Sequence, residues 1–368
     1  MADSQFSESG QSNTPPSGGA DALGPPAEMP NDIADVPKEP LSATVLETRT
    51  GRVPGPGILA ALGWTLLLLV VQTGVVIVAV VPLMLLRVSP DRMTSVLFPL
   101  GGATVVLLAV ALTVALFGSR TRAVLGLRRL GLGHALLVSL TVAPLAVVAA
   151  EIGTWAAKVL PSFSQDAYKG LAQEPYWFVL IFGCILPAVG EEVYFRGFVG
   201  RGLVARHGMI AGGLLSAVMF GLVHVDPVQA TGLLVIGLTL QGVFVATKSL
   251  LAPMLLHGLN NALGFAVLKY DDGGSEPVDH FPLLFAAAAA LALVALGVLF
   301  YQMRTRWLCP DGSEWSPGYV TAEAPPANIL AQCRAGRPSA RCLIAAALAY
   351  AAFVGAIGWI LATSSPSV

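Results

Sequence analysis

Charged residues are scarce in this sequence of 368 residues. Asp, Glu, Lys and Arg make up 12% of it and hydrophobic residues 55%, whereas an average soluble domain is about 25% charged. This balance excludes an ordinary soluble globular protein and predicts an integral membrane protein, with the lipid bilayer as its surroundings. The formal net charge of −1 lacks the basic excess of a nucleic-acid-binding protein, so we expect no nucleic-acid partner.

Several common catalytic and metal signatures are also absent. The four cysteines, Cys184, Cys309, Cys333 and Cys342, form no CxxC pair, so we expect reduced thiols rather than a metal cluster. No HExxH zinc motif occurs, and no serine or cysteine nucleophile stands beside a histidine in a recognisable elbow. Hydrolysis by this chain would therefore use a water molecule directly.

Long apolar runs recur between short polar breaks. A helix needs about 20 apolar residues to cross the hydrocarbon core of a bilayer. The pattern predicts an all-α fold, a polytopic membrane helical bundle of about eight or nine transmembrane helices. The predicted spans are 58–86, 96–117, 133–157, 176–195, 209–223, 229–246, 250–268, 282–302 and 343–362.

The same pass divides the chain into four parts. Residues 1–57, rich in Ser, Pro, Gly and acidic residues, predict a disordered cytosolic tail, because they cannot bury enough apolar surface to offset the ordering entropy. The tail begins acidic and has no apolar run, so we expect no signal peptide there. A helical core over 58–302, a cytosolic loop over 303–342 and a last span within 343–368 follow.

Basic residues mark alternate polar breaks, and short basic loops face the cytoplasm. This predicts a cytoplasmic N-terminus in a protein of the cell membrane. The basic residues of these breaks are Arg120, Arg122, Arg128, Arg129, Arg201, Arg206, Lys248, Arg304 and Arg306.

One charged cluster interrupts the apolar run at 176–195. Glu191, Glu192 and Arg196 stand in GEEVYFRG, and a charge at the bilayer centre costs roughly 3 kcal/mol on insertion scales. Glu192 and Arg196 are four apart, the favourable order for an ion pair on a helix. This spacing assigns Glu192 and Arg196 to a supporting pair and leaves Glu191 for chemistry. The alternative is that all three mark a cytoplasmic helix end.

Two further polar motifs lie in the next apolar runs. FGLVH ends at His224, and HGLNN begins at His257 and ends at Asn261. Residues four apart share a helix face. A lone histidine in an apolar run is more often a packing residue, but two histidines and an amide near an unpaired carboxylate favour a catalytic cluster.

These groups suit hydrolysis in two ways. Glu191 could act as general base toward water, with N–H groups of His224, His257 and Asn261 directed at the oxyanion. Alternatively, Glu191, His224 and His257 could be the ligands of a metal, for which Zn²⁺ is the natural candidate. The residues alone leave both mechanisms open.

The three motifs, in this order, resemble those of the CAAX-protease and bacteriocin-processing family of intramembrane proteases, over about 176–268. The resemblance implies an intramembrane endopeptidase that hydrolyses protein or peptide substrates associated with the membrane, CAAX-type proteins among them. It implies that Glu191 activates water, that Glu192 and Arg196 support the site, and that His224, His257 and Asn261 bind the oxyanion or, in an older description, a metal. A catalytically idle immunity or scaffold protein is the alternative, and an ion-coupled transporter ranks third.

Overall fold

The computed structural model describes residues 55–162, 165–270, 280–315, 325 and 330–364. Most of this length is helical, and the only regular strands in the described part of the chain are two short ones. The helices are α2 (Ile58–Leu85), α3 (Pro90–Phe117), α4 (Thr121–Val124), α5 (Leu132–Ala157), α6 (Gln165–Ala172), α7 (Tyr176–Phe178), α8 (Leu186–Glu192), α9 (Gly200–Leu222), α10 (Pro227–Thr247), α11 (Leu251–Tyr270), α12 (Leu283–Gln302) and α13 (Ala340–Ser364).

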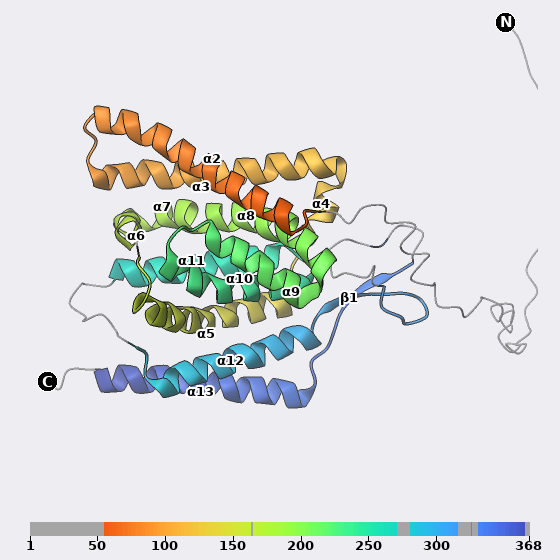
Figure 1. Ribbon diagram of the computed structural model, residues 1–368. Coiled ribbons are helices and arrows are strands. Elements are labelled where there is room, and N and C mark those ends of the chain that lie inside the picture. Colours follow the sequence, from red (N-terminus) through yellow and green to blue (C-terminus); the bar gives the residue numbers. More distant parts are fainter. Residues whose placement is uncertain (1–54, 163–164, 271–279, 316–324, 326–329, 365–368) are drawn as a thin grey trace, which may run out of the picture. The chain divides into compact units, whose positions relative to one another are not determined.

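The helices form a bundle in which two pairs flank a central group. Helix α2 packs on α3, α12 packs on α13, and α5 with α8 to α11 lies between these pairs (Figure 1). Among the described residues, eight helices are long and apolar enough to cross a membrane. The predicted polytopic helical bundle is therefore confirmed, and the protein is an integral membrane protein.

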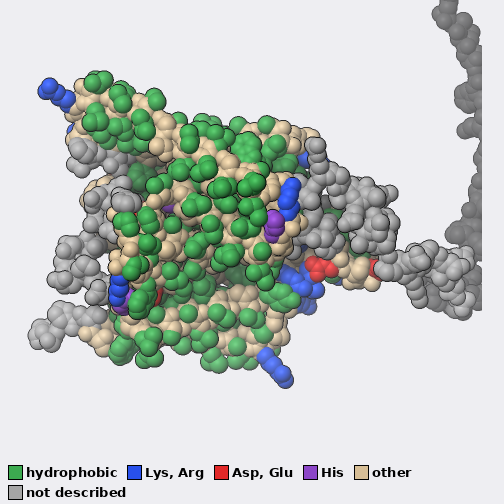
Figure 2. Space-filling model, viewed as in Figure 1, with side chains coloured by type: hydrophobic (Ala, Val, Ile, Leu, Met, Phe, Trp, Pro, Cys, Tyr) green, Lys and Arg blue, Asp and Glu red, His purple; other side chains and the backbone are tan. Residues whose placement is uncertain are grey.

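Hydrophobic side chains cover much of the outward surface of the bundle (Figure 2). Leu59 on α2, Leu107 on α3 and Leu283 on α12 are each at least 70% exposed. Exposed leucines of this kind suit lipid, which solvates an apolar side chain as well as a protein core does. The bundle interior is held instead by close packing of small and branched side chains, with Val138, Leu145 and Leu240 fully buried near the middle.

The fourth candidate span is one helical stretch of 47 residues, Tyr176–Leu222. Its backbone leaves helical geometry at Gly208, where φ is +78°. A Cβ on Gly212 would lie 2.5 Å from the Cα of Val204, so the two arms fold back against each other. The arms contain the predicted spans 176–195 and 209–223. The break predicted between them is wrong as a loop, because residues 196–207 continue the helix and bury Arg201.

The predicted loop 303–342 contains regular structure. Strands β1 (Thr305–Leu308) and β2 (Gln332–Ala335) pair antiparallel, and α13 begins at Ala340, before the expected 343. The strands are short and carry polar residues, so no run of alternating apolar residues announces them. The rest of the predicted division is untested, and the tail 1–57 lies outside the described residues except for 55–57.

The basic polar breaks meet at one end of the bundle. Ser249 donates to the carbonyl of Arg128 at 2.8 Å, the ring of His134 bonds the carbonyl of Met303 at 2.9 Å, and Arg128 contacts Cys333 at 3.6 Å. The segments that follow α3, α10 and α12 therefore share one end. This arrangement agrees with the alternation of basic breaks along the sequence.

Candidate active site

Widened helical turns position the two glutamates. Helix α8 (Leu186–Glu192) is flanked by the π-helical stretches η2 (Val179–Ile185) and η3 (Val193–Val199). Pro187 lies in the first turn of α8 and has no N–H to donate. Pro187 thus lies between two π-helical stretches, and such turns are frequent at functional sites.

The predicted ion pair of Glu192 and Arg196 is present and fully buried. Nη1 of Arg196 donates to Oε1 of Glu192 at 2.8 Å, and both side chains are 0% exposed. Nη2 of Arg196 donates to the carbonyl of Gly237 on α10 at 3.1 Å. The guanidinium carbon also lies 4.6 Å from the ring centroid of Phe220 on α9. Arg196 therefore ties three helical segments together and neutralises Glu192.

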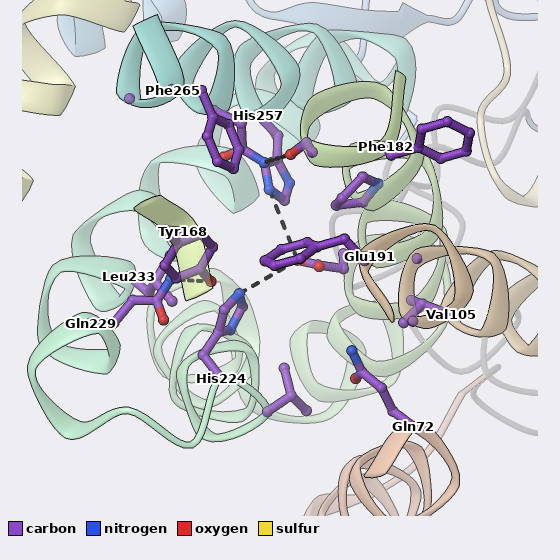
Figure 3. A pocket seen from close by; sticks show the side chains of 18 of the residues that line it. Gln72, Val105, Tyr168, Phe182, Glu191, His224, Gln229, Leu233, His257 and Phe265 are labelled. Atoms are coloured by element: carbon purple, nitrogen blue, oxygen red, sulfur yellow. Dashed lines mark hydrogen bonds and ion pairs between the residues drawn. The ribbon is translucent and has the colours of Figure 1, made fainter. Parts of the chain in front are cut away.

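Glu191 points the other way, into a pocket with both predicted histidines. Its Oε2 lies 3.9 Å from Nε2 of His224, which is in the turn that follows α9. The same oxygen lies 3.9 Å from Nε2 of His257 on α11. Figure 3 shows the carboxylate between the two rings. No described residue makes a hydrogen bond to this buried oxygen atom. Folding thus brings the three motifs together, as the sequence predicted.

The hydrogen bonds at Nδ1 fix the tautomers of both histidines. A carbonyl oxygen only accepts, so Nδ1 of His224 donates to the Phe220 carbonyl at 3.0 Å. Nδ1 of His257 donates to the Glu192 carboxylate at 2.8 Å. Each ring therefore turns Nε2 toward Glu191. In the neutral ring this nitrogen offers a lone pair, and only an imidazolium donates a proton from it.

The spacing of these atoms fits a bridging water. A separation of 3.9 Å exceeds the reach of a direct hydrogen bond. Two acceptors of one water lie about 4.4 Å apart when each hydrogen bond is about 2.8 Å long. One water can therefore donate to Glu191 and to the lone pair of a neutral histidine at the same time.

The spacing departs from that of a tetrahedral zinc site by a similar amount, in the other direction. With zinc–ligand distances of about 2.0–2.2 Å, two ligand atoms lie about 3.4 Å apart, against the 3.9 Å found here. Across the described ranges, no group of three His, Cys, Asp or Glu side chains is placed to hold a metal ion. Glu191, His224 and His257 share the pocket but do not form such a group as they stand, and no step below runs through a metal.

Asparagine side chains form another wall of the pocket. Asn261 is half-buried on α11, and its Nδ2 donates to the carbonyl of Gly183 at 3.3 Å. One amide proton of Asn261 thereby holds the side chain in place. Asn260 also lines the pocket, and its buried Oδ1 makes no hydrogen bond with any described residue. In the motif HGLNN, Asn261 is four residues after His257, whereas Asn260 falls one position short of that spacing.

Tyr168 and Gln229 also line the pocket, although no sequence motif pointed to them. Tyr168, on the short helix α6, accepts a hydrogen bond from Nε2 of Gln229 at 2.9 Å (Figure 3). Gln229 is placed by the N-cap of α10, where Asp226 accepts from the Gln229 backbone N–H at 2.9 Å. Burial, with smaller contributions from the carboxylates of Glu191 and Asp226, raises the pKa of Tyr168, so the phenol stays protonated.

The pocket has a volume of about 470 Å³. Besides the polar groups above, its lining is largely apolar, from α2, α3, η2 and α11. Leu68, Leu97, Phe182 and Phe265 are members of this wall. A chamber of this size and lining suits a peptide segment with apolar side chains.

Comparison with known families confirms the resemblance. Residues 173–263 match the sequence model of the family described as type II CAAX prenyl endopeptidase Rce1-like. The segment 173–263 is therefore similar to this family of CAAX proteases, and it is called the Rce1-like segment below. This segment contains Glu191, His224, His257 and Asn261, and the family is one of membrane proteases. Comparisons with curated proteins and with solved structures gave no match.

The Rce1-like segment ends within α11. Helices α2 and α3, which supply one wall of the pocket, and α12, α13 and the β1–β2 hairpin lie outside it. The match therefore covers the three sequence motifs and leaves the surrounding helices to be interpreted from the structure.

Proposed function

We propose that this protein is an intramembrane endopeptidase in which Glu191 activates a water molecule. The observation that carries the proposal is the position of Glu191 Oε2, which is buried and 3.9 Å from Nε2 of both His224 and His257. A carboxylate so placed can take a proton from a bound water. The water oxygen then bonds to the carbonyl carbon of the peptide, and Glu191 returns the proton to the leaving amine as the C–N bond breaks.

The two histidines have different tasks in this proposal. His224, held through Nδ1 by the Phe220 carbonyl, accepts at Nε2 a hydrogen bond from the second O–H of the water and so orients the attacking oxygen. His257, held through Nδ1 by Glu192, acts as an imidazolium and donates from Nε2 to the oxyanion. A carboxylate at Nδ1 stabilises an imidazolium and fixes its orientation. The sequence left both rings with one shared role, either at the oxyanion or as metal ligands. The different partners of Nδ1, a carbonyl for His224 and a carboxylate for His257, support separating them.

Asn261 completes the oxyanion site. One N–H of its Nδ2 donates to the Gly183 carbonyl, and the second N–H can donate to the substrate oxygen. Loss of one such donor typically slows an acyl-transfer reaction by about 10²–10³-fold. The position of Asn261 in the pocket beside His257 supports this assignment.

The substrate class that fits is a membrane-associated protein or peptide. The pocket lies among helices that are apolar enough to cross a bilayer, and its own walls are mainly apolar. Prenylated peptides of the CAAX type are the first candidates, because the matched family is described as a CAAX prenyl endopeptidase. We also propose that the basic end of the bundle faces the cytoplasm of the cell membrane. Labelling of exposed Cys333 by a membrane-impermeant maleimide only in inside-out vesicles would agree with this orientation, and labelling only in right-side-out vesicles would reverse it.

The decisive experiment compares Glu191→Gln with Glu151→Gln in the purified full-length protein. Glu151 is a matched control, a half-buried carboxylate on α5 that bonds His280 at 2.9 Å and does not line the pocket. The probes are two internally quenched peptides of one sequence, with and without a farnesylated C-terminal CAAX cysteine. We expect Glu191→Gln to lower kcat/KM by about 10²-fold or more, and Glu151→Gln to keep wild-type activity.

Other outcomes have distinct meanings. Wild-type turnover by Glu191→Gln would contradict the general-base role. Activity lost on chelation and restored by zinc would contradict the metal-free assignment. A folded wild-type protein that cleaves neither peptide would favour the catalytically idle alternative. Equal cleavage of both peptides would show that the prenyl group is not needed for recognition, and the endopeptidase proposal would stand.

A further inference from the structure

A second cavity lies between α5, α10 and α12, and it is named here the α10–α12 cavity. It has a volume of about 450 Å³ and shares no lining residue with the pocket of Glu191. Its walls come from the C-terminal halves of α10 and α12, and its polar end comes from the residues just beyond these helices. Helix α12 and the strand region lie outside the Rce1-like segment. The cavity therefore lies between the Rce1-like segment and helices outside the matched range.

Two glycines keep the cavity open. A Cβ on Gly242 of α10 or on Gly297 of α12 would meet no atom within 4 Å. Gly237, in the same helix α10, instead allows close packing, since its Cβ would lie 3.0 Å from the Ala217 side chain. A glycine inside a helix costs roughly 0.5–1 kcal/mol relative to alanine. At Gly242 and Gly297 this cost is not offset by a close helix contact, and both are exposed on the surface of the bundle.

Charged side chains gather at the polar end. Lys248 caps α10 in a left-handed conformation and is 9% exposed. Arg304 follows α12, and its Nη2 lies 4.0 Å from Oε2 of Glu314. Burial lowers the pKa of Lys248, Glu314 opposes this effect, and Arg128 and Arg304 reinforce it. Among the described residues that line the cavity, Lys248 and Arg304 are the cations and Glu314 is the one carboxylate, so this lining carries one more positive than negative charge beside its apolar walls.

We propose that the α10–α12 cavity binds a membrane phospholipid with an anionic head group. An acyl chain lies along the apolar walls at Gly242 and Gly297, and the phosphate meets Lys248 and Arg304. Basic pockets between transmembrane helices, near the membrane surface, bind anionic lipid head groups in this way. The bilayer supplies both parts of the ligand, an apolar chain at the exposed opening and an acidic group at the basic end.

The test measures lipid binding rather than cleavage, so it is independent of the proposed function. The purified full-length protein is titrated with dioleoyl phosphatidylglycerol or dioleoyl phosphatidylcholine, and bound lipid is counted by native mass spectrometry. Arg304→Gln is compared with Arg92→Gln, which changes an exposed arginine at the start of α3. Gly297→Leu, which fills the cavity, is compared with Gly355→Leu, an exposed α13 glycine that also faces open space.

We expect phosphatidylglycerol to bind more tightly than phosphatidylcholine. Arg304→Gln should weaken phosphatidylglycerol binding about fivefold, equivalent to about 1 kcal/mol for one cation near a lipid head group, and leave phosphatidylcholine binding unchanged. Gly297→Leu should weaken binding of both lipids, whereas Arg92→Gln and Gly355→Leu should match the wild type.

Three results would overturn the proposal. The first is equal affinity for the two lipids in the wild type. The second is lipid binding by Gly297→Leu that equals that of Gly355→Leu. The third is binding of glycerol 1-phosphate as tight as that of phosphatidylglycerol, because the site would then take a soluble phosphate and need no acyl chain.

Discussion

Removing the guanidinium of Arg196 should destabilise the bundle more than any exposed charge change. Arg196→Met keeps much of the side-chain volume but leaves Glu192 buried with only His257 as a partner, and frees the carbonyl of Gly237. Breaking a buried ion pair by removing one partner costs about 3–5 kcal/mol. The contact with the Phe220 ring, 4.6 Å away, adds up to about 2 kcal/mol when it is desolvated.

A double-mutant cycle separates the ion pair from the packing. Arg196→Met and Glu192→Gln each strand one buried charge, whereas the double variant strands none. We therefore expect the double variant to unfold at a higher temperature than Arg196→Met alone, with a coupling of about 1–3 kcal/mol between the two positions. Thermal unfolding in detergent, followed by tryptophan fluorescence and by size-exclusion chromatography, measures the effect.

An exposed arginine provides the control for this cycle. Arg92→Met changes a side chain on the surface of α3, and we expect it to keep the wild-type unfolding temperature. Additive losses in the cycle, or an Arg196→Met variant as stable as Arg92→Met, would refute the account of Arg196 as the group that neutralises buried Glu192. A stable but inactive Arg196→Met would instead place Arg196 among the residues of the reaction.

Four further outcomes follow from the structure. Gly212→Ala should lower the unfolding temperature, because its Cβ would lie 2.5 Å from a backbone atom of the opposite arm, while the neighbouring Gly213→Ala, at 3.5 Å from a flexible side chain, should not. Tyr168→Phe removes the acceptor of the Gln229 hydrogen bond, which contributes about 1 kcal/mol to stability, and should lower the unfolding temperature slightly. Activity on the quenched peptides should survive EDTA, measured beside a zinc-supplemented sample. Deletion of residues 2–50 should leave peptide cleavage unchanged, and loss of cleavage would give the tail a catalytic or folding role.

Local patterns predicted the helices well. The first predicted span, 58–86, corresponds to α2 at Ile58–Leu85, and the predicted span 282–302 corresponds to α12 at Leu283–Gln302. Length and hydrophobicity suffice here because a helix that crosses a bilayer must satisfy its backbone hydrogen bonds within itself. The spacing of four residues also predicted the Glu192–Arg196 pair.

Patterns failed where the chain turns on itself or pairs over a long distance. The reversal at Gly208 depends on the contact between Gly212 and Val204. A hydropathy pattern does not record this contact, because it is the same whether the chain continues straight or turns back. The β1–β2 pairing joins residues separated by the segment 309–331, and the sequence of neither short strand predicts which segment it pairs with. Tyr168 reaches the pocket because α6 packs on α3 and α11.

The sequence by itself determined that the protein lies in a membrane and where most of its helices run, and it singled out Glu191, His224 and His257 as the candidates for chemistry. These are properties of composition and of spacing within single helices. Only the tertiary structure decided which way each imidazole turns, since Nδ1 of His224 bonds its own helix while Nδ1 of His257 bonds Glu192 on another. It also decided that two cavities exist, because a cavity depends on how helices distant in sequence pack and no local pattern records it.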